Sequence, residues 1–527
     1  MSSRRRPSGY RAPMSAWPRF VALLALTASA ACGSTLQSQP GRDQGAEFGA
    51  AAPGSTSAAG PGDSGTGIAL PSPRGGTAGP TGAVRGNNPD GSGGTGSVAG
   101  GSGATAPGQS GTPTVGNSTG ISATEIRIGF VIAAGNPGTA FGGSVAYDQD
   151  ANARMVKAFV EETNARGGIA GRQIVPYYAF NDNSDQSDRA QLESQTAACT
   201  SLTEDHHVFA VIAINPGGVK MSYDCYAKHH TPLIDSVLDD ADQERMDQLA
   251  PWLLLPMYMN FTRMARLLPQ VLKQESFLSA RMGIISYDRP STRRVTEKVL
   301  APELERLGGK VLEKVYLEPS YQGIGSGTAS AVLRFKGLNI DRVVVLAPGG
   351  GALAIFASQA DSQGYHPRYG ISTYDAPANL EKLMAQTGVE RQLDGAVGVG
   401  FLPGRDILDA YAPALTPRER ACFDVVRKRT GSNYSARQQD AAAGTALGAC
   451  EHLAFLKAAL EQRVGRSLTQ PEVGVEVAKL GGRYLPVNVP SSSFGPKKLD
   501  GVNSYSVVAY TAACKCFQYR GPWRGLT

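Results

Sequence analysis

Histidine is scarce in this chain. Only six occur in 527 residues, and four of them form two adjacent pairs, His206-His207 and His229-His230. Adjacent side chains point in different directions on a helix or a strand, so neither pair has the geometry of a metal site. The sequence also lacks a Ser/His/Asp set, a metal-ligand spacing and a nucleotide-binding loop. These absences argue against most enzyme classes, and an exported enzyme that uses carboxylates is the form left open.

Concentrated charge and long apolar runs are also missing. The net charge is +6, and the basic residues are scattered rather than interleaved with aromatic ones, so we expect no nucleic-acid binding. After residue 31, no stretch is long and apolar enough to cross a membrane. The Gly-x-Ser-x-Gly run at residues 116–120 has no predicted strand before it and no predicted helix after it, so it is not a nucleophile elbow. The glycines at 349–351 are not followed by Gly-Lys-Ser/Thr, so they are not a phosphate-binding loop.

The first 32 residues have the pattern of an export signal. Basic residues precede an apolar run at residues 20–31, which is too short to span a bilayer comfortably. Small residues then precede Cys32. This order resembles a bacterial lipoprotein signal, and it predicts that a lipidated Cys32 anchors the protein to the outer side of the cell membrane. Ser29 stands where leucine is common, so an ordinary secretory signal is the alternative.

Residues 33–122 consist mostly of Gly, Ser, Thr, Ala and Pro, and Phe48 is their only aromatic residue. Such a segment cannot bury enough apolar surface to offset its ordering entropy, so we predict a disordered tether. The rest of the chain, residues 123–527, has a globular composition. Its length exceeds that of one ordinary domain and predicts two lobes.

A β-α-β unit opens the globular part. An amphipathic helix is predicted at residues 150–164, between strands at 126–133 and 173–180. Asn164 and the glycines at 167–168 suit a left-handed helix end, and a further glycine suits the turn into the second strand. A β-α-β unit builds a parallel sheet.

The alternation continues along the chain. Further strands are predicted at residues 208–213, 232–235, 282–286 and 342–347, and helices at 186–203, 219–229, 261–274, 293–307, 353–363 and 435–462. This order predicts an α/β fold with mostly parallel sheets covered by helices. The Pro-rich residues 251–256 interrupt it and suit a crossing between lobes.

The run Asn-Ala-Arg-Gly-Gly-Ile-Ala-Gly at residues 164–171 resembles the Asn-x-x-Gly-Gly-Ile-x-Gly segment of type I periplasmic solute-binding proteins. The branch it resembles most is the leucine/isoleucine/valine-binding family, which serves ABC importers. The similarity extends more weakly over residues 121–519, with family-like text at 283–288, 307–311 and 341–351. The resemblance implies a two-lobed fold, a hinge and ligand capture by closure. No cofactor or metal is expected.

This resemblance gives the expected domain organisation. The signal occupies residues 1–32 and the tether 33–122. The N-terminal lobe is expected at 123–256 plus about 376–485. The C-terminal lobe is expected at about 257–375 plus 486–527.

In open parallel sheets, ligands bind outside the carboxyl ends of the strands. The loop that carries Asn215, Gly217, Gly218 and Val219 follows a predicted strand and opens a helix, so its backbone N–H groups suit a carboxylate. Relatives usually carry serine or threonine hydroxyls in this loop. The glycines here retain the backbone contribution and lose the hydroxyls, which argues against an α-amino acid ligand.

The other candidate ligand-binding residues also follow predicted strands. Asp375 resembles the acidic residue that meets the ligand's amine in the family, and Gly349 removes a bulky contact that relatives supply. The alternatives are an aspartate that caps a helix and a tyrosine that fills the lobe interface. The candidates in these loops are Asp235, Ser236, Tyr287, Gly349, Tyr374 and Asp375.

Six cysteines remain after Cys32, and an even count in an exported protein favours disulfides. Of the fifteen possible connectivities, local pairing is preferred. The last pair is predicted either to form a small ring or to stay reduced. The candidate pairs are Cys199 with Cys225, Cys422 with Cys450, and Cys514 with Cys516.

The leading hypothesis is a monomeric, lipid-anchored extracytoplasmic solute-binding protein. It would deliver a small polar ligand, such as an amino acid, an amide or a related compound, to an ABC importer permease. A ligand-sensing module of a signalling system is the alternative, and an exported enzyme is a lesser one.

Overall fold

The computed structural model describes residues 118–135, 148–185, 187–214, 223–235 and 241–526. The chain divides into a unit of residues 1–104 and a unit of residues 105–527, and every described residue belongs to the second. The predicted signal, Cys32 and most of the predicted tether therefore lie outside the described residues. At the tether's end, Ile121 is buried and pairs with Ile126, so the folded part includes residues assigned to the tether.

The first sheet has five parallel strands in the order β2-β1-β3-β4-β5. They are β1 (Glu125–Ala134), β2 (Gln173–Asp182), β3 (Ala210–Ile214), β4 (Leu233–Ile234) and β5 (Leu253–Leu254). All five residues of β3 are buried, as expected for a strand covered on both faces. Helix α1 (Gln149–Ala165) connects β1 to β2, which confirms the predicted β-α-β unit.

The glycine turn after α1 requires its glycines. Gly168 has φ +75°, and a Cβ there would lie 1.8 Å from the Arg172 carbonyl oxygen. Asn164 then ties the helix end to β2, because its Oδ1 accepts from the Ile174 N–H at 2.7 Å and its Nδ2 donates to the Ile174 oxygen at 2.9 Å. The motif on which the family resemblance depends therefore has a local structural role.

The second sheet has seven strands in the order β12-β11-β10-β9-β8-β6-β7. They are β6 (Met282–Tyr287), β7 (Val311–Leu317), β8 (Arg342–Leu346), β9 (Arg368–Ser372), β10 (Val397–Gly400), β11 (Ser504–Thr511) and β12 (Cys516–Gly525). The first five are parallel to their neighbours in that set, and β11 and β12 add an antiparallel hairpin. The expectation of mostly parallel sheets is confirmed.

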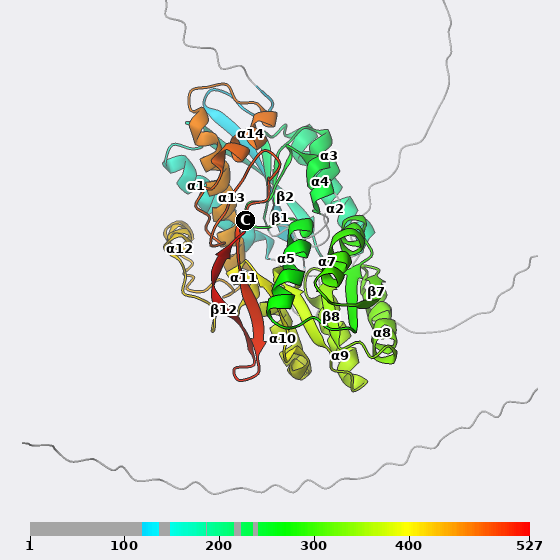
Figure 1. The fold of residues 1–527 in the computed structure, drawn as a ribbon. Coiled ribbons are helices and arrows are strands. Elements are labelled where there is room, and N and C mark those ends of the chain that lie inside the picture. Colours follow the sequence, from blue (N-terminus) through cyan, green and yellow to red (C-terminus); the bar gives the residue numbers. More distant parts are fainter. Residues whose placement is uncertain (1–117, 136–147, 186, 215–222, 236–240, 527) are drawn as a thin grey trace, which may run out of the picture. The chain divides into compact units, whose positions relative to one another are not determined.

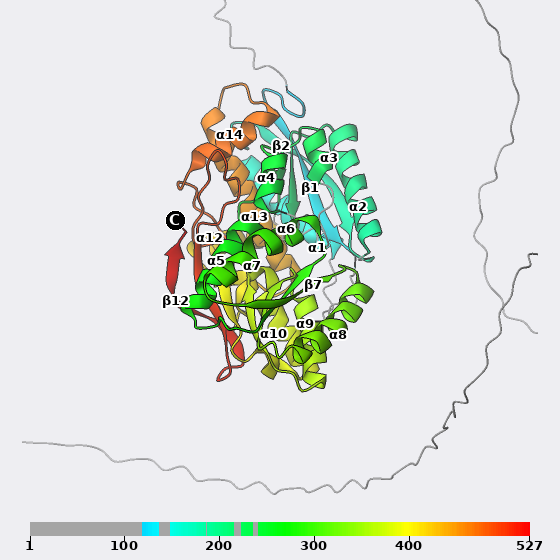
Figure 2. The same cartoon turned by 45° about the vertical axis from the view of Figure 1, so that its right-hand side comes forward.

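Helices pack on both sheets. The further helices are α2 (Asp188–Thr200), α3 (Tyr223–Lys228), α4 (Gln243–Leu249), α5 (Phe261–Gln274), α6 (Pro290–Val295), α7 (Ala301–Arg306), α8 (Tyr321–Gly337), α9 (Gly351–Ser362), α10 (Pro377–Thr387), α11 (Pro403–Asp406), α12 (Pro417–Thr430), α13 (Ala441–Leu460) and α14 (Gln470–Leu480). Figures 1 and 2 show α13 and α14 (orange) among the early elements α1, β1 and β2 (cyan). The chain thus returns to the first sheet late in the sequence, and α13 packs against α1 and β3.

Three segments connect the elements of the two sheets. They run from β5 to α5, from β10 to α12, and from α14 to β11. The predicted crossing at residues 251–256 overlaps β5 itself, and the chain crosses directly after that strand. The second crossing was expected near residue 376, which is too early. Leu380 and Met384 of α10 belong to the core of the second sheet, and β10 lies within that sheet.

All three predicted disulfides are present. Cys199–Cys225 joins α2 to α3, Cys422–Cys450 joins α12 to α13, and Cys514–Cys516 closes the turn between β11 and β12. For the last pair, the disulfide rather than the reduced form is observed. Within the described ranges, no helix combines the length and apolar character needed to span a bilayer.

Candidate functional site

Five of the predicted ligand-binding residues cannot be placed. Asn215, Gly217, Gly218, Val219 and Ser236 lie outside the described residues. Their role stays a prediction.

Tyr374 and Asp375 are buried at the end of β9. The Tyr374 hydroxyl donates to the Met259 carbonyl oxygen, and its ring lies 4.5 Å from the Phe261 ring, centroid to centroid. Asp375 Oδ2 accepts from the Ser372 N–H at 2.8 Å, and burial raises the pKa of this carboxyl to about 8. Tyr374 therefore fills an interface and Asp375 caps a helical turn, which are the alternatives raised from the sequence.

The other described candidates are divided between the two sheets. Tyr287 ends β6 and packs in the core of the second sheet, whereas Asp235 is buried at the end of β4 in the first sheet. Gly349 has φ +101° and donates its N–H to the Tyr374 oxygen at 2.8 Å, so it contacts the β9 turn directly. Gly350 approaches that turn as closely, since a Cβ there would lie 2.5 Å from the Asp375 oxygen.

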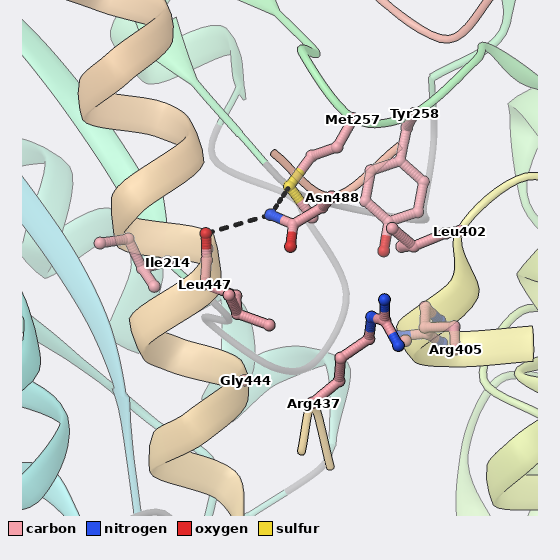
Figure 3. A pocket seen from close by; sticks show the side chains of 11 residues that line it. Ile214, Met257, Tyr258, Leu402, Arg405, Arg437, Gly444, Leu447 and Asn488 are labelled. Atoms are coloured by element: carbon pink, nitrogen blue, oxygen red, sulfur yellow. Dashed lines mark hydrogen bonds between the residues drawn. The ribbon is translucent and has the colours of Figure 1, made fainter. Parts of the chain in front are cut away.

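A cavity of about 190 Å³ lies where the crossing segments meet α13. Figure 3 shows its lining, which comes from β3, the segments after β5 and β10, the segment before α13, helix α13 itself and the segment before β11. None of the predicted ligand-binding residues that are described here lines it. The lining residues are Ile214, Met257, Tyr258, Leu402, Gly404, Arg405, Arg437, Gly444, Leu447, Gly448 and Asn488.

Arg405 lies in the short helix α11, which begins at Pro403 shortly after β10 ends. Its sequence neighbour Asp406 turns away from the cavity, since Asp406 Oδ2 accepts from the Leu402 N–H at 3.0 Å and from the Tyr519 hydroxyl at 2.7 Å. Among the described residues, Arg405 forms no ion pair with a carboxylate, and its buried Nε has no hydrogen-bond partner.

Tyr258 is the polar neighbour of Arg405 in the cavity wall. Burial raises the pKa of the Tyr258 hydroxyl, and the positive charge of Arg405 opposes the rise. Figure 3 shows the Tyr258 hydroxyl and the Arg437 guanidinium facing each other, with Arg405 beside them. The cavity therefore gathers hydrogen-bond donors on one side.

The charge of Arg437 is neutralised within the protein. Its Nε and Nη2 donate to the two carboxylate oxygens of Glu419 at 2.5 and 2.7 Å, and Nη1 donates to the Pro413 oxygen at 2.7 Å. The guanidinium and the carboxylate are both buried. Arg437 thus forms part of the wall, whereas Arg405 presents a charge that has no carboxylate partner within the described ranges.

Helix α13 forms the opposite wall with its backbone. Gly444 and Gly448 are one helical turn apart, and Gly444 has no neighbouring heavy atom within 4 Å of where a Cβ would stand. Asn488 is fixed beside them, because its Nδ2 donates to the Leu447 oxygen at 3.0 Å. The absence of side chains at the two glycines leaves space for a ligand.

This lining was not predicted from the sequence, for an identifiable reason. The predicted strands did not include β10, so the loop that carries Arg405 was not among the candidate loops. The glycines at 444 and 448, one turn apart in an alanine-rich helix, were the available signal. Across the described part of the chain, no cluster of three or more His, Cys, Asp or Glu residues is arranged to hold a metal ion.

Comparison with known proteins identifies the family. A type 1 periplasmic binding protein from Bordetella pertussis Tohama I is 15% identical with a TM-score of 0.54, covering 76% of this chain and 100% of its own. A possible leucine/isoleucine/valine-binding protein from Rhodopirellula baltica SH 1 is 11% identical with a TM-score of 0.53 (76% and 97%). A solute-binding protein of an ABC transporter from Rhodopseudomonas palustris BisB5, in complex with 3,4-dihydroxybenzoic acid, is 11% identical with a TM-score of 0.51 (76% and 97%).

At sequence identities of 11–15%, these structures show that the fold is similar and no more. No curated protein matches the sequence. The family described as periplasmic binding protein matches residues 125–474, which is more than half of the sequence. The chain therefore belongs to the periplasmic binding protein family.

Proposed function

We propose that the protein is an extracytoplasmic solute-binding protein that delivers a small polar ligand to an ABC importer. The observation that carries this proposal is the cavity at the three crossing segments, which is lined by residues attached to both sheets. A ligand held there contacts both sets of elements, so binding favours the arrangement in which they are close together.

Contacts between the crossing segments support a hinge. The Leu255 N–H donates to the Leu499 oxygen at 2.9 Å, and the Gly501 N–H donates back to the Leu255 oxygen at 2.6 Å. Asp500 accepts from the Asn260 N–H at 2.8 Å and pairs with Arg263 at the start of α5. These bonds couple the first and third segments, so the elements on either side would rotate about a common axis.

The setting of the proposal comes from the N-terminal sequence. Export followed by lipidation at Cys32 would hold the protein at the membrane, and residues 33–117 would give it reach toward a permease. We propose that it works as a monomer. The solved relatives include a possible branched-chain amino-acid binder and a complex with an aromatic acid, so ligand identity has to come from this chain's own cavity.

A thermal-shift screen of the soluble chain from residue 33 onward tests the proposal. The library should contain anionic, cationic, zwitterionic and neutral metabolites, followed by calorimetry on each hit. A ligand at 100 times its Kd stabilises the folded state by about 2.7 kcal/mol, which is readily detected. If no compound of any class raised the melting temperature, solute binding would be refuted.

A further inference from the structure

The cavity's charges indicate which ligand class it takes. We propose that it binds a small carboxylate whose anionic group is held by Arg405 and Tyr258, with the rest of the molecule against Met257, Leu402 and Leu447. This inference rests on the proposed solute-binding function and makes it specific.

Arg405 presents a positive charge that forms no ion pair in the described part of the chain. It is half-buried, and among the described residues it pairs with no carboxylate. The nearby acids are poor counter-ions, because burial raises the pKa of Asp406 to about 7 and that of Asp375 to about 8. At pH 7 Asp375 is therefore mostly protonated and Asp406 about half protonated, and Asp406 Oδ2 is already occupied by Leu402 and Tyr519. Partial burial of a charge without a partner has a cost, and an anionic ligand reduces that cost.

The hydrogen-bond donors of Arg405 and Tyr258 suit a carboxylate. A guanidinium presents its N–H donors in a planar fork that matches a carboxylate, and such charge-assisted hydrogen bonds are about twice as strong as neutral ones. The Tyr258 hydroxyl, which lies on the same side of the cavity, adds a donor. Arg437 does not compete for the ligand, because Glu419 already neutralises it.

The rest of the described cavity lining suits a small, mainly apolar molecule. Apart from Tyr258, Asn488 and the two arginines, the described lining is apolar or glycine, and it contains no aspartate or glutamate. The ammonium of a zwitterionic amino acid would therefore lack a counter-charge there. The volume of about 190 Å³ lies below the roughly 300–1,000 Å³ of sites for drug-sized ligands, which favours a small molecule.

Matched pairs of compounds test this assignment. The probes are benzoate with benzamide, 3-methylbutanoate with 3-methylbutanamide, and leucine, measured by calorimetry and thermal shift. We expect at least one carboxylate to bind the wild-type protein, and its amide and leucine to bind far more weakly. Arg405→Gln should weaken carboxylate binding roughly tenfold to a hundredfold, as expected for loss of a hydrogen bond to a charged group. Arg405→Lys keeps the positive charge but loses the planar pair of donors. Its affinity for the carboxylate should lie between those of the wild-type protein and Arg405→Gln.

Arg391→Gln is the matched control, because Arg391 is exposed and does not line the cavity. It makes the same change of charge and should leave binding unchanged. Melting temperatures of all variants without ligand establish that they fold. Binding of an amide or leucine in preference to the carboxylates, or carboxylate binding that Arg405→Gln leaves intact, would overturn this assignment while leaving solute binding in place. Failure of these probes and of the whole metabolite library would overturn both.

Discussion

Arg437 and Glu419 form a buried, two-pronged ion pair at the edge of the cavity. Nε and Nη2 of the guanidinium each donate to a different carboxylate oxygen, and the side chains are 6% and 2% exposed. Glu419 is also the third residue of α12, where its second oxygen accepts from the Thr416 N–H at 2.7 Å. The pair therefore joins the start of α12 to the segment that precedes α13.

Removing one member of this pair should destabilise the protein strongly. Glu419→Ala leaves the Arg437 guanidinium buried without a counter-charge, which costs roughly 3–5 kcal/mol of unfolding free energy. Urea unfolding followed by circular dichroism measures the loss. The double variant Glu419→Leu with Arg437→Met should recover part of it, because no charge is then left unpaired. A double variant as unstable as the sum of both single ones would contradict this account.

The Cys422–Cys450 disulfide should contribute more to stability than Cys514–Cys516. The first bridges residues 28 apart and the second residues 2 apart, and the entropy that a crosslink removes from the unfolded chain grows with the closed loop. We expect paired Cys→Ala variants to lose about 2–4 kcal/mol for the first bridge and distinctly less for the second. Thermal unfolding under oxidising conditions compares them, and equal losses would show that loop length does not govern the effect.

Local sequence signals were sufficient for much of the fold. Helix α5 was predicted at its observed bounds, and its buried Phe261, Leu268 and Leu272 recur at helical spacing. Local pairing gave the disulfides, since Cys199 and Cys225 lie in neighbouring helical segments. These features depend on residues near one another in the chain.

Elements stabilised mainly by tertiary contacts were missed. Helix α8 contains Gly323, Gly325 and Gly327, which lower helix propensity, yet it forms by packing on α9 and β7. Strand β10 also alternates with glycine, because a Cβ at Gly398 would lie 1.6 Å from the Ile371 oxygen. No local pattern reveals that a neighbouring strand approaches so closely.

The candidate site was harder to predict than the fold for the same reason. Arg405 and Gly444 reach one cavity only because the chain crosses after β10 and returns through α12 and α13. The crossing was expected near residue 376, before the residues that form β10 in the second sheet. The loops proposed from the sequence follow strands, whereas most of the described cavity lining comes from the crossing segments and from α13.

Stability should fall as pH rises from about 5 to 8. Burial raises the pKa of Asp406 from 3.8 to about 7, so between these values the folded protein keeps a proton that the unfolded chain has lost. The stabilisation of the folded state by this proton is complete below pH 4 and disappears as pH rises through 7. Asp375, whose pKa is raised to about 8, extends the same decline in stability to about pH 8. Glu162 acts in the opposite direction only below pH 4.5, because contacts with Arg429 lower its pKa to about 2.

Melting temperatures between pH 5 and 9 measure this dependence. Asp406→Asn retains an oxygen that accepts from Leu402 and Tyr519 but cannot ionise, so it should flatten the decline, by at most about 1.4 kcal/mol per pH unit. Asp394→Asn, at an exposed position, is the control and should leave the slope as it is. A slope that Asp406→Asn does not change would show that this carboxyl is not the titrating group.

We expect Gly444 to lower the stability of α13 while leaving space for a ligand in the cavity. It lies in the first half of α13, and alanine is a better helix former by roughly 0.5–1 kcal/mol, with no heavy atom within 4 Å of the new Cβ. Gly444→Ala should therefore raise the melting temperature, whereas Gly444→Leu should fill the cavity and weaken binding of the carboxylate identified by calorimetry. Gly325→Ala in α8 is the matched control, since its Cβ also meets no neighbour but lies outside the cavity lining, so stability should rise without a change in affinity. If Gly444→Leu bound the carboxylate as tightly as the wild-type protein, the ligand would have to occupy a different part of the molecule.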